Sequence, residues 1–304
     1  MPSTRTLGSL GLFILTACDL GQSRTIITSA QVSSVAAVAT NTDADLMFMG
    51  TAGGQIAQAD PSTGVVHSTS WLWGGASSAM VAVTPDGQDS ARVWSLHADG
   101  WVVNWADGPV LTDFFAPPPF AGVERTLCDL DHAQDGDFYV STVEDGQAQL
   151  WRRDGGTNVW MSSIISGDAC PRIAHDLYHD ELYVLRGDGF TFEHRNADSL
   201  ALQSWEILDA DGGAIADVDV FGNAAVGAGT SSAPNLPGGG QGPAFNMAWS
   251  FDPATGNTVS AKIISMAAPA AVHITVNANT GNGEMLIGSP VGNPTVRGVQ
   301  LLVP

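Results

Sequence analysis

Residues 126–165 read TLCDLDHAQDGDFYVSTVEDGQAQLWRRDGGTNVWMSSII, and residues 171–208 repeat the pattern as PRIAHDLYHDELYVLRGDGFTFEHRNADSLALQSWEIL. Each copy begins with a short apolar run and a polar turn. A run with an aromatic–aliphatic pair follows, then a glycine-containing turn and two more runs. Short runs of this kind, separated by turn residues every 8–12 residues or so, are typical of an all-β repeat. The two copies therefore predict consecutive four-stranded units.

The same pattern extends along most of the chain. The run expected as the second strand of each unit recurs about every 45 residues. These second runs begin at Leu46, Arg92, Asp137, Glu181, Asn223 and Glu284. The last interval is longer because residues 231–243 (SSAPNLPGGGQGP) interrupt the fifth unit. The sixth unit has only three runs, so we expect the isolated run at residues 23–31 to supply its missing outer strand.

A period near 45 residues with four strands per unit resembles a β-propeller. The predicted fold is all-β, a six-bladed β-propeller of four-stranded antiparallel blades, with the ring closed by an N-terminal strand in the last blade. The resemblance is one of architecture. No unit carries the Gly-His and Trp-Asp pairs of WD40 repeats, and two Asp-Pro-x-Thr-Gly turns, at residues 60–64 and 252–256, are reminiscent of quinoprotein-like propellers.

The N-terminal residues resemble the signal peptide of a bacterial lipoprotein. Residues 1–18 read MPSTRTLGSLGLFILTAC, in which Arg5 precedes an apolar stretch too short to span a bilayer as a helix. The final Leu15-Thr16-Ala17-Cys18 resembles a lipobox, whose cysteine is acylated and becomes the mature N-terminus. An ordinary secretory signal with a chance cysteine is the alternative.

The lipobox implies a lipidated Cys18 at the end of a signal peptide of residues 1–18. A short tether and closing strand at residues 19–33 and a propeller domain at residues 34–304 would follow. The expected location is the bacterial cell envelope, on the extracytoplasmic side of a membrane and held there by lipid chains.

Cys128 and Cys170 are the two cysteines that remain after Cys18. An even number of cysteines in an oxidising compartment favours a disulfide. They lie near the starts of the first strands of consecutive units, so we predict a bond between them. A pair of buried free thiols is the alternative.

The charge of the chain excludes some classes of partner. It has 31 acidic and 11 basic residues, with a formal net charge of −20. Such a surface repels phosphate backbones and anionic lipid headgroups, so we expect no nucleic-acid binding and membrane contact only through the lipid anchor.

Two groups of residues could form a functional site. The loops that lead into the blades hold aromatic and proline residues, and loops of this kind often dock partners. The candidate partner-binding residues are Trp73, Phe115, Phe120, Arg125 and Arg172. The alternative is that these prolines and aromatics only bridge adjacent blades. Trp71, Trp160 and Trp205 share one position on the fourth strands, which predicts packing between blades.

The second group lies on first strands, which line the central channel of a propeller. Carboxylates and imidazoles that converge there could hold Ca²⁺ or Zn²⁺ and activate water, as in some six-bladed lactonases. Side chains alternate between the faces of a strand, so only some of them can face the channel. The candidate metal ligands are Asp129, Asp131, His175, Asp176, Asp217 and His273.

We therefore expect a non-enzymatic, monomeric binding or scaffold module without a cofactor. Its partner would be a protein or glycan of the cell envelope. The alternative is a metal-dependent, lactonase-like hydrolase that uses the channel residues. The sequence contains no nucleophile elbow, phosphate-binding glycine loop or His-Glu-x-x-His motif that would favour another enzyme class.

Overall fold

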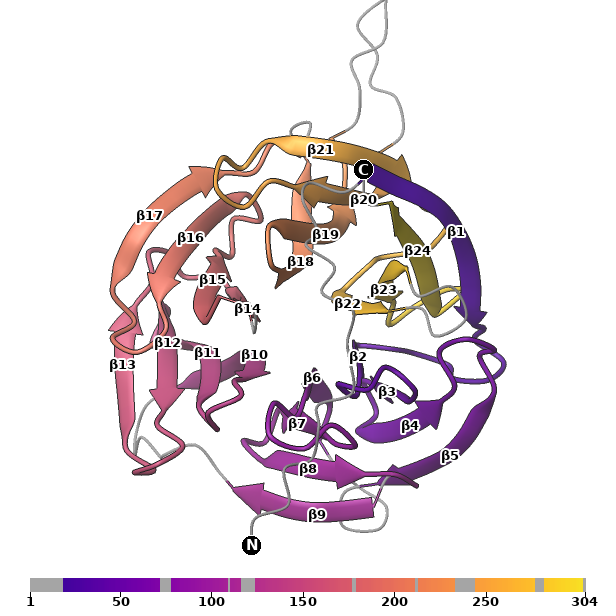
Figure 1. The fold of residues 1–304 in the computed structure, drawn as a ribbon, viewed down its shortest axis with the longest axis horizontal. Helices are drawn as coiled ribbons and strands as arrows, with labels where there is room; N and C mark the ends of the chain where they lie inside the picture. The colour runs from indigo at the N-terminus through magenta and orange to yellow at the C-terminus, as the bar shows by residue number, and fades with distance from the viewer. Residues whose placement is uncertain are drawn as a thin grey trace, which may run out of the picture.

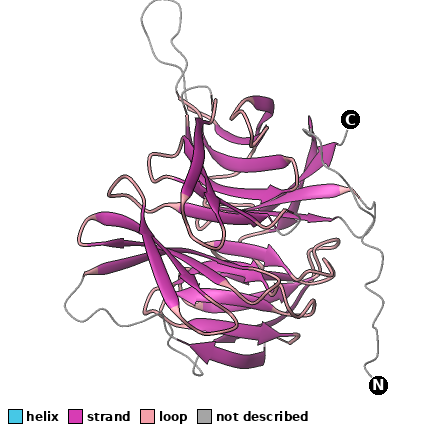
Figure 2. Cartoon of the chain, turned by 60° about the vertical axis from the view of Figure 1, so that its left-hand side comes forward, coloured by secondary structure: helices cyan, strands magenta, loops and turns pink. Residues whose placement is uncertain are grey.

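The computed structural model describes residues 19–71, 78–108, 110–115, 124–176, 179–210, 213–232, 244–276 and 282–302. In these residues the chain forms six four-stranded antiparallel sheets, arranged as blades around a central axis (Figure 1). The long regular elements of these described residues are all β-strands (Figure 2). The predicted six-bladed β-propeller is confirmed. Within the described ranges, no helix is long and apolar enough to cross a membrane.

Each of the first three blades is one continuous segment of chain. Blade one consists of β2 (Ala37–Thr40), β3 (Met47–Gly50), β4 (Gln55–Ala59) and β5 (Val66–Trp71). Blade two consists of β6 (Met80–Pro85), β7 (Val93–His97), β8 (Val102–Ala106) and β9 (Val110–Phe115). Blade three consists of β10 (Arg125–His132), β11 (Phe138–Glu144), β12 (Gln147–Arg153) and β13 (Trp160–Ile164).

Blades four and five repeat this order, whereas blade six combines both ends of the described chain. Blade four consists of β14 (Arg172–Asp176), β15 (Glu181–Leu185), β16 (Thr191–Asn196) and β17 (Leu202–Ile207). Blade five consists of β18 (Ala214–Phe221), β19 (Ala224–Thr230), β20 (Asn246–Phe251) and β21 (Thr258–Ile263). Blade six consists of β22 (Ala271–Val276), β23 (Gly283–Gly288), β24 (Val296–Leu302) and, outermost, β1 (Asp19–Ile27).

The pairing of β1 with β24 closes the ring, as the sequence predicted. The closing strand occupies residues 19–27 rather than the predicted 23–31. It ends earlier because the chain turns after Ile27, where the backbone N–H groups of Gln31 and Val32 both donate to the carbonyl oxygen of Thr28. It also begins earlier, since Asp19 already pairs with β24 through the backbone.

A partly buried ion pair fixes the closing strand to its own blade, and the same arginine binds blade one. Arg24 of β1 donates to both carboxylate oxygens of Glu284 in β23, each at 2.7 Å. The same guanidinium donates to the carbonyl oxygens of Pro61 and Ser62 in the predicted turn at residues 60–64. Gly64 ends that turn at φ 71°, and a Cβ there would collide with the carbonyl oxygen of Ile26.

The hydrophobic core lies between consecutive blades. Between blades one and two, for example, Phe48 and Ile56 pack with Val93 and Trp105, and all four side chains are fully or almost fully buried. Each blade therefore uses its neighbour as the second layer of a sandwich.

The outer tryptophans behave differently from one another. Trp160 of β13 packs against the cluster between blades two and three, as predicted. The prediction is wrong for Trp205 of β17, whose exposed fraction is 54%. Every residue of β17, the outermost strand of blade four, is at least partly exposed. The side chain of Trp71 lies outside the described part of the structure.

Candidate functional site: the central cavity

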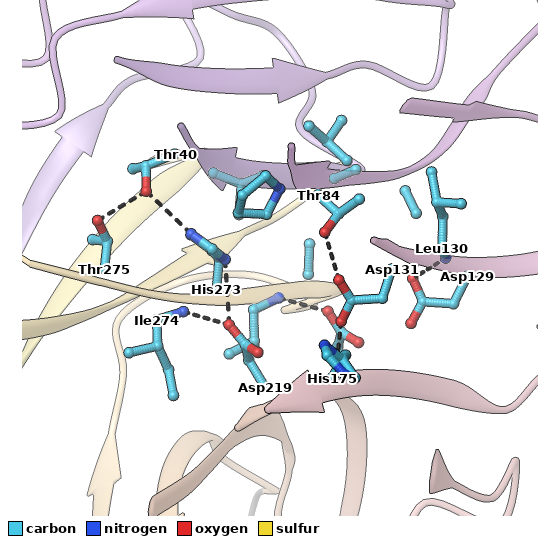
Figure 3. A pocket seen from close by; sticks show the side chains of 18 of the residues that line it. Thr40, Thr84, Asp129, Leu130, Asp131, His175, Asp219, His273, Ile274 and Thr275 are labelled. Atoms are coloured by element: carbon cyan, nitrogen blue, oxygen red, sulfur yellow. Dashed lines mark hydrogen bonds and ion pairs between the residues drawn. The ribbon is translucent and has the colours of Figure 1, made fainter. Parts of the chain in front are cut away.

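A cavity of about 680 Å³ occupies the centre of the ring. The first strands of all six blades line it, namely β2, β6, β10, β14, β18 and β22. Much of the wall is aliphatic, with Val83, Ile173, Val218 and Val272 among its residues. Polar residues line it on every blade, and its aspartates lie on β10 and β18 and at Asp43, after β2. Figure 3 shows how Asp129, Asp131 and Asp219 lie among the neighbouring polar side chains.

Two aspartates of β10 connect blade three to blade four. Asp129 and Asp131 are two residues apart, so the strand geometry places their side chains on the same face. Asp129 Oδ2 accepts a hydrogen bond from the backbone N–H of Ile173 at 2.9 Å. Asp131 Oδ2 accepts one from the backbone N–H of His175 at 2.7 Å. Both carboxylates thus bind the backbone of β14 in the next blade.

Two aspartates of β18 connect blade five to blade six in the same way. The backbone N–H of Val272 donates to Asp217 Oδ2 at 2.6 Å, and that of Ile274 donates to Asp219 Oδ2 at 2.7 Å. In both blades the motif is Asp-x-Asp on the first strand, and the acceptor atoms reach the following blade. The four carboxylates act as inter-blade bridges at the inner ring.

Arg172 of β14 lies between the two Asp-x-Asp strands. Its Nη1 donates to the carbonyl oxygen of Cys128 at 2.6 Å, and its Nε donates to that of Ala216 at 3.2 Å. One guanidinium therefore connects blade four to blades three and five. Its positive charge also favours the ionised forms of Asp129 and Asp217.

Burial raises the pKa of the cavity carboxyls. It raises the pKa of Asp129 to about 6, against the opposing effects of Arg172 and two backbone N–H donors. It raises the pKa of Asp217 well above the ordinary range, with a further contribution from the charge of Asp129. The pKa of Asp131 is also raised, first by burial and in addition by the charge of Asp219. The aspartates of β10 and β18 therefore interact across the cavity.

Most ring nitrogens of the two cavity histidines His175 and His273 lie within hydrogen-bond or ion-pair distance of other protein atoms. His273 of β22 has Nε2 at 3.1 Å from Thr40 Oγ1 and Nδ1 at 3.2 Å from Asp219 Oδ2. His175 has Nε2 at 3.0 Å from Asp180 Oδ1. His273 thus connects blades five, six and one at the inner ring.

Five of the six predicted metal ligands line the cavity, namely Asp129, Asp131, His175, Asp217 and His273. Asp176 does not; it is fully buried and bridges the backbone N–H of Gly222 and the Nδ1 of His179. Among the described residues, no group of three or more His, Cys, Asp or Glu side chains is arranged to hold a metal ion. The carboxylates instead point to backbone amides of the next blade.

Only some of the predicted partner-binding residues lie in the described part of the structure. Trp73 and Phe120 lie outside the described residues, and only the backbone of Phe115 is described, at the end of β9. Arg125 begins β10, where its Nε forms an ion pair with Glu144 at 2.9 Å. Arg172, expected on the loop face, lines the cavity instead.

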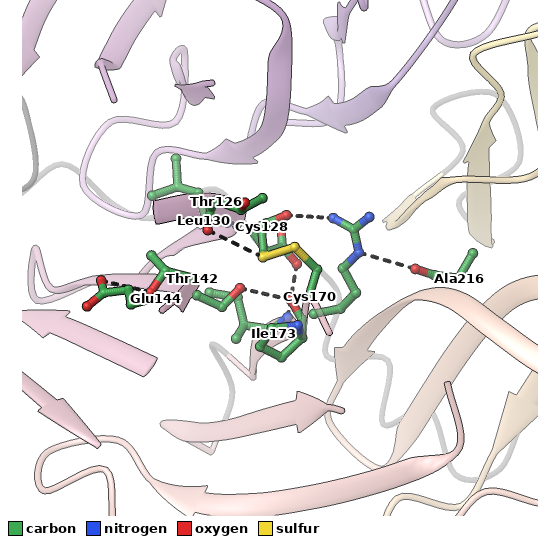
Figure 4. Close-up of a disulfide and its surroundings, with 12 residues drawn as sticks. Thr126, Cys128, Leu130, Thr142, Glu144, Cys170, Ile173 and Ala216 are labelled. Carbon is green, nitrogen blue, oxygen red and sulfur yellow. Dashed lines mark hydrogen bonds between the residues drawn. A yellow bond between two sulfur atoms is a disulfide. The ribbon is translucent and has the colours of Figure 1, made fainter. Parts of the chain in front are cut away.

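The structure contains a disulfide between Cys128 and Cys170, whose Cα atoms are 5.3 Å apart (Figure 4). It joins β10 to the segment just before β14. In the same region, Ser141 Oγ of β11 donates to the carbonyl oxygen of Pro171 at 2.8 Å. Blades three and four are therefore linked covalently as well as by the bridges of Asp129 and Asp131.

Sequence reasoning missed the threonines at this site. Thr84 of β6 donates to Asp131 Oδ1 at 2.7 Å and so links blade two to blade three. Thr40 of β2 and Thr275 of β22 have their hydroxyl oxygens 2.9 Å apart, which links blade one to blade six. The position of each threonine on a first strand was predictable from the sequence. Only acids and histidines, however, were predicted to act at the inner ring.

Comparisons with known proteins find a similarity of fold and none of sequence family. No protein-family model matches it, and no curated protein sequence matches it. Among solved structures, it resembles a luciferin-regenerating enzyme with a TM-score of 0.65 and 11% identity, over 90% of this chain and 94% of the other. It also resembles the WD40 repeats of RRP9 with a TM-score of 0.61 and 10% identity, over 94% and 99% of the two chains. At such low identity the likeness is one of fold alone.

Proposed function

We propose that the protein is a binding module, a preorganised propeller that presents a loop face to a protein or glycan of the cell envelope. The observation that carries the proposal is the use of the cavity carboxylates. Asp129, Asp131, Asp217 and Asp219 each accept a backbone N–H of the following blade. These residues have a structural role, which leaves the outer surface for function. These bonds preorganise the ring, and a preorganised binder loses little entropy when it binds.

The proposed module is monomeric and anchored in a membrane of the cell envelope through acylated Cys18. The lipobox at residues 15–18 supports this location. The disulfide between Cys128 and Cys170 also supports it, because disulfides persist in oxidising compartments.

The alternative, a lactonase-like hydrolase, requires several ligands that converge on one metal ion. In the described residues the acids and histidines form pairwise bridges instead. We therefore give the binding module preference over the hydrolase.

The test uses cross-linking in the native envelope with a loop-face variant and a matched control. The variant Trp73→Ala/Phe120→Ala removes two predicted aromatic anchors. The control Trp205→Ala removes an aromatic side chain that is 54% exposed on the outer strand of blade four. We expect the double variant to lose most of the cross-linked partner and the control to retain it, since buried aromatic anchors dominate binding energy.

Unchanged cross-linking by a folded double variant would contradict the assignment of the loop face. Equal loss in the double variant and in Trp205→Ala would show that capture depends on exposed aromatics in general and not on this face. Circular dichroism of each variant checks that the ring is intact.

A further inference from the structure

The start of β1 leaves no free chain between the propeller and Cys18. Asp19 pairs with Leu302 of β24, and the backbone N–H of Leu20 donates to Ser260 Oγ of β21 at 3.1 Å. Lys262 Nζ of β21 donates to the carbonyl oxygen of Gly21. Consecutive Cα atoms are about 3.8 Å apart, so a group attached to Cys18 starts within one residue of this edge of the disc.

The strands β21, β1 and β24 form this edge, and we call them the β1 rim. Figure 1 shows β21 and β1 following one another along the outside of blades five and six. The rim contains one acidic residue, Asp19, and three basic ones, Arg24, Lys262 and Arg297. This balance is opposite in sign to that of the whole chain, which has 31 acidic and 11 basic residues.

The charges of the rim are not all available to a partner. Glu284 neutralises Arg24 through their ion pair. Arg297 donates to the carbonyl oxygen of Ser265 and to Ser23 Oγ, both uncharged acceptors. Lys262 likewise donates to a carbonyl oxygen. Lys262 and Arg297 therefore leave a positive potential on this edge.

Large apolar side chains are exposed on the same edge. Ile263 at the end of β21 is 59% exposed, and Leu302 at the end of β24 is 42% exposed. Leu302 pairs directly with Asp19, the first residue of β1. Ala261 lies two residues before Ile263 and is also exposed, so it shares the outward face of the strand. The rim combines apolar and cationic groups at the point where the chain continues to Cys18.

We propose that the β1 rim is the membrane-facing edge of the propeller, with Ile263 and Leu302 in the lipid headgroup region. The inference rests on the lipid anchor at Cys18 proposed above, and it extends the membrane contact expected from the sequence, which was through the anchor only, to the side chains of this edge. Lipid chains attached one residue before β1 hold this edge at the bilayer surface, where apolar side chains are partly buried and cations meet lipid phosphates. The disc then stands on its edge, and both flat faces remain open to partners.

A matched pair of variants tests the orientation. Ile263→Cys places a thiol on the β1 rim, and Ile164→Cys places one on β13 of blade three. The two isoleucines are 59% and 57% exposed, and β13 lies across the ring from β1 (Figure 1). Because Cys128 and Cys170 form a disulfide, the introduced cysteine is the free thiol in a chain acylated at Cys18. Leu302→Cys on the rim and Met161→Cys on β13 provide a second pair. Leu302 is 42% exposed and Met161 is 41% exposed.

Each acylated variant carries a fluorophore on its new cysteine and is reconstituted into phosphatidylcholine vesicles with or without nitroxide-labelled lipid. We expect several-fold stronger quenching at positions 263 and 302 than at positions 164 and 161. Mass spectrometry of the N-terminal peptide first shows whether Cys18 is acylated. If it is, equal quenching at the rim and control positions would overturn the orientation alone. An unmodified Cys18 in the same mass measurement would overturn the anchor and the orientation together.

Discussion

Asp129 illustrates how a buried carboxylate holds two blades together in the inner ring. Its two oxygens accept backbone N–H groups of Leu130 and Ile173, which belong to successive blades. Burial still raises its pKa to about 6, because the cavity wall is largely aliphatic. Arg172 opposes this effect and binds both flanking blades through their carbonyl oxygens.

The raised pKa of Asp129 predicts the direction of pH dependence. An aspartate has a pKa of about 3.9 in an unfolded chain, so the folded state binds the proton more tightly. The free energy of unfolding should therefore rise as the pH falls from 7 toward 4, and this contribution is lost as the pH rises through about 6. For one such group the gain is about 2–3 kcal/mol.

Urea unfolding of the wild type and of Asp129→Asn between pH 7 and pH 5 measures this contribution. We expect a smaller pH dependence in Asp129→Asn, even though the variant is less stable overall. Asp168→Asn, at an exposed position between β13 and β14, should keep the wild-type dependence. An identical pH profile in wild type and Asp129→Asn would show that Asp129 does not titrate in this range.

Strand β1 matters because it supplies the outermost strand of blade six and so joins the two ends of the described chain in one sheet. Its last two residues, Ile26 and Ile27, belong to a core cluster with Val38 and Met47 of blade one. Arg24 adds the ion pair to Glu284. The strand thus contributes both backbone pairing to β24 and apolar packing to the first blade.

Shortening the side chain of Ile27 tests how much the closing strand contributes to the stability of the ring. Ile27 is fully buried, so Ile27→Ala should lower the free energy of unfolding by about 2–4 kcal/mol. Gln22→Ala, at an exposed position of the same strand, should change it by less than about 0.5 kcal/mol. Equal small effects in urea unfolding would mean that β1 is not needed for the stability of the ring.

The sequence predicted most elements but not the contacts between them. Strand positions could be predicted because turn residues such as Gly64 and the alternation of apolar residues are local signals. The start of β1 could not, since Asp19 pairs through its backbone and shows no side-chain pattern. The exposure of Trp205 depends on what covers β17, which is a property of the assembled ring.

The same limit applies to the candidate site. Asp129, Asp131 and Asp217 were predicted as channel residues, because the resemblance to a propeller implies that first strands line a channel. Their hydrogen-bond partners are backbone N–H groups of the next blade, and every residue except proline carries such a group. Residue identity therefore contains no information about these partners, and the acids were instead predicted to bind a metal.

At the scale of the whole molecule, each blade junction has its own polar connection. Between blades one and two, Thr42 Oγ1 donates to the carbonyl oxygen of Asp86 at 3.3 Å. The backbone N–H of Gly222 donates to Asp176 Oδ1 between blades four and five, at 2.9 Å. The ring is therefore joined by polar bonds at its inner side and by apolar packing farther out.

The disulfide should contribute strongly to the stability of this ring. Cys128 and Cys170 are 42 residues apart, and a cross-link of this span stabilises a protein by about 3–4 kcal/mol in the chain-entropy model. We expect Cys128→Ala/Cys170→Ala to lower the free energy of unfolding by this amount in urea titrations. A reductant should destabilise the wild type and leave the double variant unchanged. Insensitivity of the wild type to the reductant would contradict the role of the bond.

Metal content and thermal unfolding, measured together on the purified protein of residues 19–304 after dialysis, test most directly whether the cavity acids are structural. We predict no retained Ca²⁺ or Zn²⁺ and the same unfolding temperature in chelator and in added metal, because Asp129, Asp131, Asp217 and Asp219 are used by inter-blade bonds. About one tightly held metal ion per chain, with a lower unfolding temperature in chelator, would contradict this role and favour the hydrolase.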